Sequence, residues 1–244
     1  MKVEVWTDMI CPFCYIGKRR LEAGLEKFEH SEDVNIVYRS FELDPYIEVN
    51  PPGDVYEQAA AKKGSTPEHM KAIQETITKR AAEDGLKFNY DTAKPTNTFN
   101  AHRLLKYAMK FGKGDQMMER LYQAYFTDSL HLGDVDTLVE LAVESGLDRR
   151  DTKAMLASNQ FGDEVRADEL EASQLGIRGV PFYVINDKYA ISGAQPAEVF
   201  TEALQQAWKE ENPIIPFQSS SVDPDVAICE DGSCRIPSDP NKAE

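Results

Sequence analysis

The chain has 244 residues, of which 41% are hydrophobic, and its 42 acidic and 27 basic residues give a net charge of −15. This length suits one elaborated domain or two closely joined ones with a sizeable core. A polyanion whose lysines and arginines gather in no one stretch repels phosphate backbones and anionic bilayers. We therefore expect neither nucleic acid nor membrane as a partner.

The N-terminal segment carries no recognisable targeting signal. Residues 1–6 lead straight into an alternation of charged and apolar side chains, without the apolar run that a secretory signal needs. No other stretch approaches membrane-spanning length. We therefore expect a cytoplasmic protein, in which the four cysteines do not form a structural disulfide framework.

The first part of the chain predicts a strand, a helix and a second strand. Residues 2–7 alternate charged and apolar side chains before turning apolar, which is typical of a strand. Pro12 stands where proline is favoured, at the first position of a helix. Apolar residues follow it at helical spacing: Tyr15, Ile16, Leu21, Leu25 and Phe28. With a second strand over residues 34–41, the segment forms a βαβ unit.

A long helical segment follows. Pro51-Pro52-Gly53 breaks the chain after the second strand, and Asp134 and Gly146 have the character of an N-cap and a C-terminal stop. Apolar residues three and four positions apart predict helices over residues 66–85, 97–111, 115–126, 134–145, 151–158 and 163–175.

Strand signals return after these helices. Residues 180–185 form a buried-strand pattern, an Asn-Asp turn follows, and residues 188–192 complete a hairpin. A last helix is predicted to reach about Trp208. From Gln218 onward, six acids, two bases and three prolines with one short apolar run indicate a flexible tail.

The motif Cys11-Pro12-Phe13-Cys14 lies where the first strand passes into the first helix. A thiol at a helix N-terminus faces unpaired N–H donors and the positive end of the helix dipole, which favour the thiolate of Cys11. Cys14, one turn later, is placed to attack a mixed disulfide on Cys11. The alternatives are half of a zinc site or two inert core cysteines. No second C-x-x-C motif or histidine pair lies nearby, so we expect no metal.

Pro181 opens a strand that has the character of a central one, in the sequence Gly179-Val180-Pro181. A trans proline would interrupt the hydrogen-bond ladder at this position, and a cis Val180–Pro181 bond accounts for the placement. The alternative is a proline that merely opens an edge strand.

Together these features resemble the DsbA family of thioredoxin-fold proteins, and most closely its cytoplasmic FrnE-like branch. The resemblance covers about residues 2–210. It rests on CPFC at a strand–helix junction, the helical insertion, Gly-Val-Pro before a hairpin, and the closing helix. Supporting stretches are residues 38–43, 100–103 and 192–195. The resemblance implies an α/β thioredoxin fold with a large α-helical insertion and a flexible C-terminal tail.

The resemblance also implies residue roles. Cys11 is the attacking thiol, Cys14 the resolving thiol, and Pro181 the cis proline that packs against them. The best-known periplasmic members have His where Phe13 stands. Because Phe cannot hydrogen-bond the Cys11 thiolate, we expect a weaker oxidant than those members. The residues that the resemblance assigns to substrate binding are Val180, Phe13 and Pro12.

The implied reaction is thiol–disulfide exchange or isomerisation on protein disulfides, with oxidised or disulfide-containing proteins as partners. In a reducing cytosol, reduction or isomerisation is favoured over net oxidation. We expect no cofactor beyond the redox-active disulfide itself, with glutathione or thioredoxin as electron donor. The oligomeric state stays open.

Two other functions stay open. FrnE-like chains also resemble 2-hydroxychromene-2-carboxylate isomerases and kappa-class glutathione transferases, which usually have serine at the position of Cys11 and use glutathione. A second thiol at Cys14 is superfluous for isomerisation, so the pair favours redox chemistry. A non-catalytic, chaperone-like peptide-binding module is the third reading, and redox turnover with an intact Cys11 separates it from an enzyme.

Three residues outside the motifs receive a structural interpretation. His102 and His131 lie in Leu-rich stretches predicted to be helical, and we interpret both as packing residues with satisfied hydrogen bonds. Arg178, just before the proline, is assigned either to contact with an acidic substrate or to a surface salt bridge.

The tail contains a second cysteine pair, Cys229 and Cys234, with Glu230 and Asp231 between them. Such a gap can close a disulfide, so we interpret the pair as a second redox couple; exposed cysteines without function and, less favoured, a metal ligand pair are the alternatives. Negative neighbours disfavour thiolates. We therefore expect the tail disulfide to be the more stable one and the reduced tail to pass electrons to an oxidised Cys11–Cys14 pair.

The predicted organisation thus has three parts. Residues 1–52 and 166–212 form the thioredoxin-like core, and residues 53–165 form the helical insertion. Residues 213–244 form a flexible C-terminal extension with the second cysteine pair.

Overall fold

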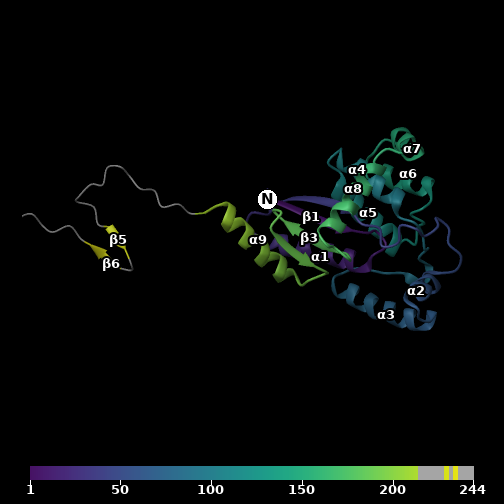
Figure 1. Ribbon diagram of the computed structural model, residues 1–244, viewed down its shortest axis with the longest axis horizontal. Helices are drawn as coiled ribbons and strands as arrows, with labels where there is room; N and C mark the ends of the chain where they lie inside the picture. Colours follow the sequence, from purple (N-terminus) through teal and green to yellow (C-terminus); the bar gives the residue numbers. More distant parts are fainter. Residues whose placement is uncertain (214–227, 231–232, 236–244) are drawn as a thin grey trace, which may run out of the picture. The chain divides into compact units, whose positions relative to one another are not determined.

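The computed structural model describes residues 1–213, 228–230 and 233–235 (Figure 1). The chain divides into two compact units, Met1–Glu210 and Glu211–Glu244. In the second unit, β5 (Ile228–Glu230) and β6 (Ser233–Arg235) form an antiparallel pair. The sequence interpretation, which treated the whole extension as flexible, did not predict these strands.

The first unit contains a four-stranded sheet of order β2-β1-β3-β4. The strands are β1 (Lys2–Thr7), β2 (Asn35–Ser40), β3 (Phe182–Ile185) and β4 (Tyr189–Ser192). β1 and β2 are parallel and are joined through α1 (Pro12–Glu26), whereas β3 pairs antiparallel with both β1 and β4. The βαβ unit, the C-terminal hairpin and the thioredoxin-like α/β fold are confirmed.

Helices form the remainder of the first unit. They are α2 (Val55–Lys63), α3 (Pro67–Glu83), α4 (Phe99–Met109), α5 (Gly114–Phe126), α6 (Val135–Glu144), α7 (Arg149–Ala157), α8 (Gly162–Gln174) and α9 (Ala197–Glu211). The sequence pattern did not predict α2 as a helix of its own. α8 is continuous across residue 166, where the predicted boundary between insertion and core falls. None of the helices among the described residues combines the length and apolar character needed to cross a bilayer.

Local sequence accounts for the helix ends. The Asp134 carboxylate accepts a hydrogen bond from the Thr137 amide at 2.9 Å and so caps the N-terminus of α6. The same helix ends at Glu144 and is followed by Gly146, whose φ is 77°. Asp54 and Glu57 form a reciprocal capping box at the start of α2. The predicted cap and stop of α6 are therefore confirmed.

One face of the sheet packs against α1 and α9. Val3, Val5, Tyr183 and Ile185 are buried on this face in the main hydrophobic cluster. The Tyr183 ring lies edge-on to Phe200 of α9, with 4.8 Å between ring centroids. Burying these apolar side chains is the main favourable term that holds both helices on the sheet.

The opposite face carries an ionic network centred on Asp168 of α8, which is 3% exposed. Its carboxylate accepts from the Arg39 guanidinium at 2.9 Å and from the Ser40 amide at 2.7 Å, and it pairs with Lys106 of α4. Its backbone carbonyl accepts from the Trp6 indole at 3.2 Å. One residue thus joins β1, β2, α4 and α8.

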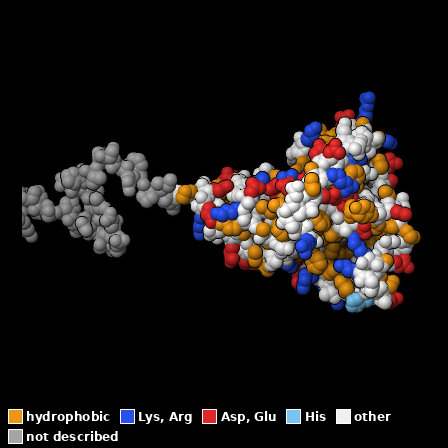
Figure 2. Space-filling view, in the orientation of Figure 1, with side chains coloured by type: hydrophobic (Ala, Val, Ile, Leu, Met, Phe, Trp, Pro, Cys, Tyr) orange, Lys and Arg blue, Asp and Glu red, His pale blue; other side chains and the backbone are white. Residues whose placement is uncertain are grey.

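The surface of the first unit is mixed in charge. On the face shown in Figure 2, Lys and Arg side chains are interspersed with acidic ones and do not gather in a basic patch.

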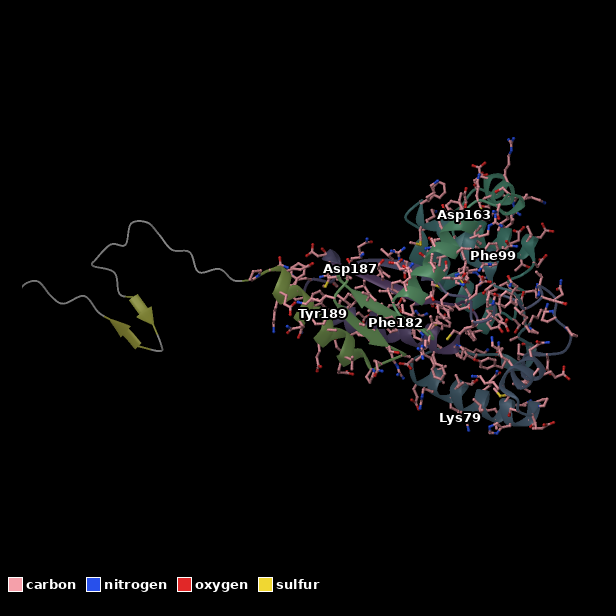
Figure 3. All side chains as sticks on the ribbon, viewed as in Figure 1. Lys79, Phe99, Asp163, Phe182, Asp187 and Tyr189 are labelled. Atoms are coloured by element: carbon pink, nitrogen blue, oxygen red, sulfur yellow. The ribbon has the colours of Figure 1, made fainter. Side chains whose placement is uncertain are left out.

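Asp168→Ala is expected to lower the free energy of unfolding by about 3 kcal/mol, because it removes the buried carboxylate that pairs with Arg39 and Lys106 and leaves the Ser40 amide without its acceptor. Asp163→Ala is the matched control: Asp163 is exposed in the first turn of the same helix (Figure 3), and its loss should cost less than about 1 kcal/mol. Urea denaturation measures both. Equal losses in the two variants would contradict the network's role.

Candidate active site

Cys11 and Cys14 are positioned by the junction between β1 and α1. Cys11 is the N-cap residue of α1, with extended backbone angles of φ −86° and ψ 113°, and Pro12 occupies the first helical position. The Cys11 amide donates to the Asp8 carbonyl at 3.1 Å, which closes the turn that leads out of β1. The predicted placement of the first cysteine at a helix N-terminus is confirmed.

Both cysteines are buried free thiols. The Cys11 thiol donates to the Val180 carbonyl, with 3.5 Å between sulfur and oxygen. Burial raises the pKa of the Cys14 thiol well above its ordinary value, and the hydrogen bond and charge of Cys11 raise it further. The Thr7 hydroxyl and the Asp8 amide, which hydrogen-bond the Cys14 sulfur, act in the opposite direction. Cys14 is therefore a buried thiol whose ionisation is disfavoured.

The segment before β3 forms the opposite wall of the site. The Val180–Pro181 bond is cis, as the sequence predicts. The Pro181 carbonyl accepts from the Gly193 amide at 2.8 Å, which ties the segment to the end of β4. On the other side, a Cβ atom on Gly17 of α1 would lie 3.1 Å from Pro181 Cγ and 2.2 Å from the Tyr183 hydroxyl oxygen. The absence of a side chain at Gly17 lets the first helix approach Pro181 closely.

The helical insertion also reaches the thiols, through Tyr122 of α5. The Tyr122 hydroxyl is hydrogen-bonded to the Thr7 hydroxyl, which in turn contacts the Cys14 sulfur. The Tyr122 ring stacks on Tyr15 with 4.7 Å between centroids, and the Tyr15 hydroxyl donates to Glu119 at 2.7 Å. The sequence analysis had assigned no role to Thr7 or Tyr122. One sequence feature could have identified Thr7: it is the last residue of the strand that leads into the motif.

One exposed apolar residue lies within the motif, and one exposed cation precedes Val180. Phe13 is 37% exposed, although it lies between two buried cysteines. Arg178 is exposed and forms no ion pair with any residue that the structure describes, so the surface salt bridge considered for it is not found among those residues. It lines an open cleft of about 410 Å³ with Val180, Pro181 and the end of β4.

A second cleft, of about 600 Å³, lies among α2, α3 and residues 88–92. Its buried member Tyr90 has a raised pKa, chiefly because of burial, with a smaller contribution from the charge of Cys11.

The structure corrects the interpretation of His102 as a satisfied residue and the predicted helical location of His131, whose ring does have a hydrogen-bond partner. His102 is fully buried on α4, but neither ring nitrogen finds a hydrogen-bond partner among the described residues, so it is not a satisfied packing residue. His131 lies outside α6, in the turn before it, and its Nε2 is 2.9 Å from the Val49 carbonyl. Among residues 1–213 and the two described strands of the tail, no cluster of three metal-ligating side chains is found.

Comparison with known proteins agrees with this geometry. The profile of the DSBA-like thioredoxin domain family matches residues 2–205. The chain is 41% identical to a probable DsbA oxidoreductase from Streptomyces coelicolor, whose crystal structure superimposes with a TM-score of 0.82. That match covers 97% of this chain and 99% of that one.

Two more distant structures are similar in fold alone. A 2-hydroxychromene-2-carboxylate isomerase is 16% identical, with 88% of this chain and all 100% of that chain covered and a TM-score of 0.65. The cytosolic disulfide reductase DsbM from Pseudomonas aeruginosa is 15% identical, with 86% and 100% covered and a TM-score of 0.60, and it has also been solved with GSH. The fold therefore occurs in both a reductase and an isomerase.

The pKa shift of Cys14 predicts its reactivity. Because a raised pKa lowers the thiolate fraction at any given pH, Cys14 should alkylate far more slowly than Cys11 at pH 8. The measurement is a time course with iodoacetamide, followed by peptide mass spectrometry, in a variant whose Cys229 and Cys234 are serine. Labelling of Cys14 before Cys11 would contradict the assignment of the two thiols.

Proposed function

Because the chain belongs to the DSBA-like thioredoxin domain family, we propose that it is a thiol–disulfide oxidoreductase that reduces or isomerises protein disulfides. The observation that carries the proposal is the pair of free thiols at the start of α1, with Cys11 against the Val180 carbonyl and Cys14 protected behind it. Two thiols one turn apart, of which the second has a raised pKa, suit sequential attack and resolution.

The reaction proceeds in two exchanges. The Cys11 thiolate attacks one sulfur of a substrate disulfide, forming a mixed disulfide and releasing the other substrate sulfur as a thiolate. Cys14 then loses its proton and attacks the Cys11 sulfur. This step forms the Cys11–Cys14 disulfide and releases the second substrate thiolate, so the substrate gains the two electrons that the pair loses. In isomerisation, a second substrate thiolate attacks the mixed disulfide in place of Cys14.

The surroundings of Cys11 suit an extended peptide. The Val180 backbone borders the attacking sulfur, and the exposed ring of Phe13 offers an apolar contact next to Pro12. The cleft beside Arg178 adds a cationic wall. We assign these residues to binding a peptide that carries the disulfide, with Pro181 holding the Val180 backbone in place.

The direction of exchange follows from the compartment and from Phe13. With no hydrogen-bonding side chain between the cysteines, the thiolate of Cys11 has only the helix terminus and its immediate neighbours to stabilise it. We assign the chain to the cytoplasm and to net reduction or isomerisation, with glutathione or thioredoxin restoring the dithiol. The similar fold of a cytosolic disulfide reductase supports this assignment.

A glutathione-dependent isomerase is the principal alternative, since an isomerase shares the fold. The buried Cys14 argues against it, because isomerisation through one glutathione thiolate has no use for a resolving thiol. Disulfide turnover that requires Cys14 separates the two functions.

The tail pair adds a second redox couple to the proposal. In the β5–β6 register, Cys229 lies directly opposite Cys234. Directly opposed residues in antiparallel strands have Cα atoms about 4.5–5.5 Å apart, which falls within the range of disulfides, about 4.4–6.8 Å. The register thus supports the prediction that this pair closes a disulfide.

Cys11→Ser is expected to abolish insulin reduction, because no nucleophile remains at the helix terminus. Cys14→Ser should instead accumulate a mixed disulfide on Cys11, visible on a non-reducing gel and cleaved by dithiothreitol, because the resolving thiol is missing. A variant with Cys229 and Cys234 replaced by serine is the matched control and should keep single-turnover attack by Cys11. Full activity of Cys11→Ser would overturn the redox assignment.

The same tail variant tests the second couple. Its multiple-turnover rate with a dithiol donor should fall several-fold relative to the wild type, while its single-turnover rate stays unchanged, because regeneration of the Cys11–Cys14 dithiol has lost its internal donor. Mass mapping of the oxidised wild type should show a Cys229–Cys234 disulfide. Identical turnover in both proteins would remove the tail from the reaction.

A further inference from the structure

A buried polar cluster lies behind the turn that carries Cys11. It consists of Asp8 from the turn after β1, Glu42 from the segment after β2, and His102 from α4. Asp8 and His102 are 0% exposed, and the Glu42 side chain is 0% exposed as well. The atoms of this cluster that find no hydrogen-bond partner among the described residues are Asp8 Oδ1, Glu42 Oε1, His102 Nδ1 and His102 Nε2. Unsatisfied polar atoms gathered at full burial call for an explanation.

Asp8 connects this cluster to both thiols. Its carbonyl accepts from the Cys11 amide at 3.1 Å, and its own amide hydrogen-bonds the Cys14 sulfur. One carboxylate oxygen, Oδ2, accepts from the Leu43 amide at 2.7 Å. The other, Oδ1, lies 3.5 Å from Nε2 of His102. A charge on Asp8 is thus held three residues before the attacking thiol.

The cluster contains two carboxyl oxygens without a donor beside one imidazole ring. The two oxygens are on Asp8 and on Glu42. A neutral imidazole has one N–H group, whereas an imidazolium has two. His102 also interacts electrostatically with Glu42: burial raises the pKa of Glu42, and the charge of His102 lowers it. The His102 ring lies 3.5 Å from the Asp8 carboxyl group and within electrostatic range of Glu42.

The neighbouring groups leave room for a cation at His102. The other oxygen of Glu42 pairs with Arg166 of α8, on the outer side of the cluster. Arg103, beside His102 on α4, is turned away and donates to the Met155 carbonyl at 2.9 Å. The buried residues of α6 are all apolar. The charged groups next to His102 are Asp8 and Glu42; Arg166 and Glu169 lie beside Glu42, and Tyr125 is within electrostatic range of Asp8.

We propose that His102 is a positioning residue for the redox pair. As an imidazolium it balances the Asp8 carboxylate behind the Cys11 turn, and so sets how readily Cys11 ionises. Without that cation, the Asp8 charge disfavours the Cys11 thiolate. Since the thiolate stabilises the reduced form, the pair then becomes a stronger reductant. The inference rests on the proposed redox function and identifies a residue that regulates it.

The test uses the charge-removing variants His102→Gln and Asp8→Asn, separately and together, with Cys229 and Cys234 replaced by serine. His102→Gln should raise the pH of half-maximal Cys11 alkylation by about one unit and shift the equilibrium with glutathione about tenfold toward the Cys11–Cys14 disulfide. Asp8→Asn should shift both quantities the other way. The double variant should return close to the wild type, because both charges are gone.

His69→Gln is the matched control. His69 is exposed on α3, and its replacement should leave both quantities unchanged. A loss of thermal stability in His102→Gln, with alkylation and glutathione equilibrium as in the wild type, would reduce His102 to a structural residue and overturn the proposal. A wild-type chain that forms no Cys11–Cys14 disulfide in glutathione buffers would instead overturn the redox function itself.

A measurement on the unmodified ring keeps the proposal open to refutation if His102→Gln does not fold. Long-range nitrogen–proton NMR distinguishes an imidazolium, whose two nitrogens are both protonated, from either neutral tautomer. The buried ring should give the imidazolium pattern at pH 7 in the dithiol form. A neutral tautomer in both the dithiol and disulfide forms would contradict the charge that the proposal requires.

Discussion

The close approach of α1 to the segment before β3 is the contact on which the active site depends. It requires a residue without a side chain at Gly17, because a Cβ atom there would lie 2.2 Å from the Tyr183 hydroxyl oxygen and 3.1 Å from Pro181 Cγ. Tyr183 is held in turn by Phe200 of α9. This packing brings the N-terminus of α1, and with it the Cys11 sulfur, to the Val180 carbonyl. The proposed exchange needs the attacking sulfur beside a backbone that a peptide can reach, and this contact places the two together.

The helical insertion contributes to the chemistry as well as to the core. Tyr122 of α5 reaches Thr7, stacks on Tyr15 of α1 and so closes the space behind Cys14. That burial is the largest cause of the raised pKa of Cys14. A thioredoxin-like sheet and its first helix would place the two thiols one turn apart, but the difference in their protection depends on a helix that the insertion supplies.

Asp8 contributes to the site through both its backbone and its carboxylate. Its backbone closes the turn before Cys11 and hydrogen-bonds Cys14, while its carboxylate holds the Leu43 amide and faces His102. A fully buried carboxylate is costly unless it is balanced, and a single protonated ring balances it without adding bulk behind the motif. The Asp8 carboxylate and the His102 ring thus form one buried pair behind the motif.

The sequence by itself determined the features that depend on neighbouring residues. The CPFC motif at a strand–helix junction, the cap and stop of α6, and the placement of Pro181 all follow from local backbone chemistry. Tertiary structure alone decided that Tyr122 meets Thr7 and that His102 faces Asp8 without a hydrogen-bond partner. Hydrophobic periodicity reports which face of a helix is buried, but it carries no signal for what that face meets. A histidine in an apolar pattern therefore looked satisfied until the fold placed a carboxylate beside it.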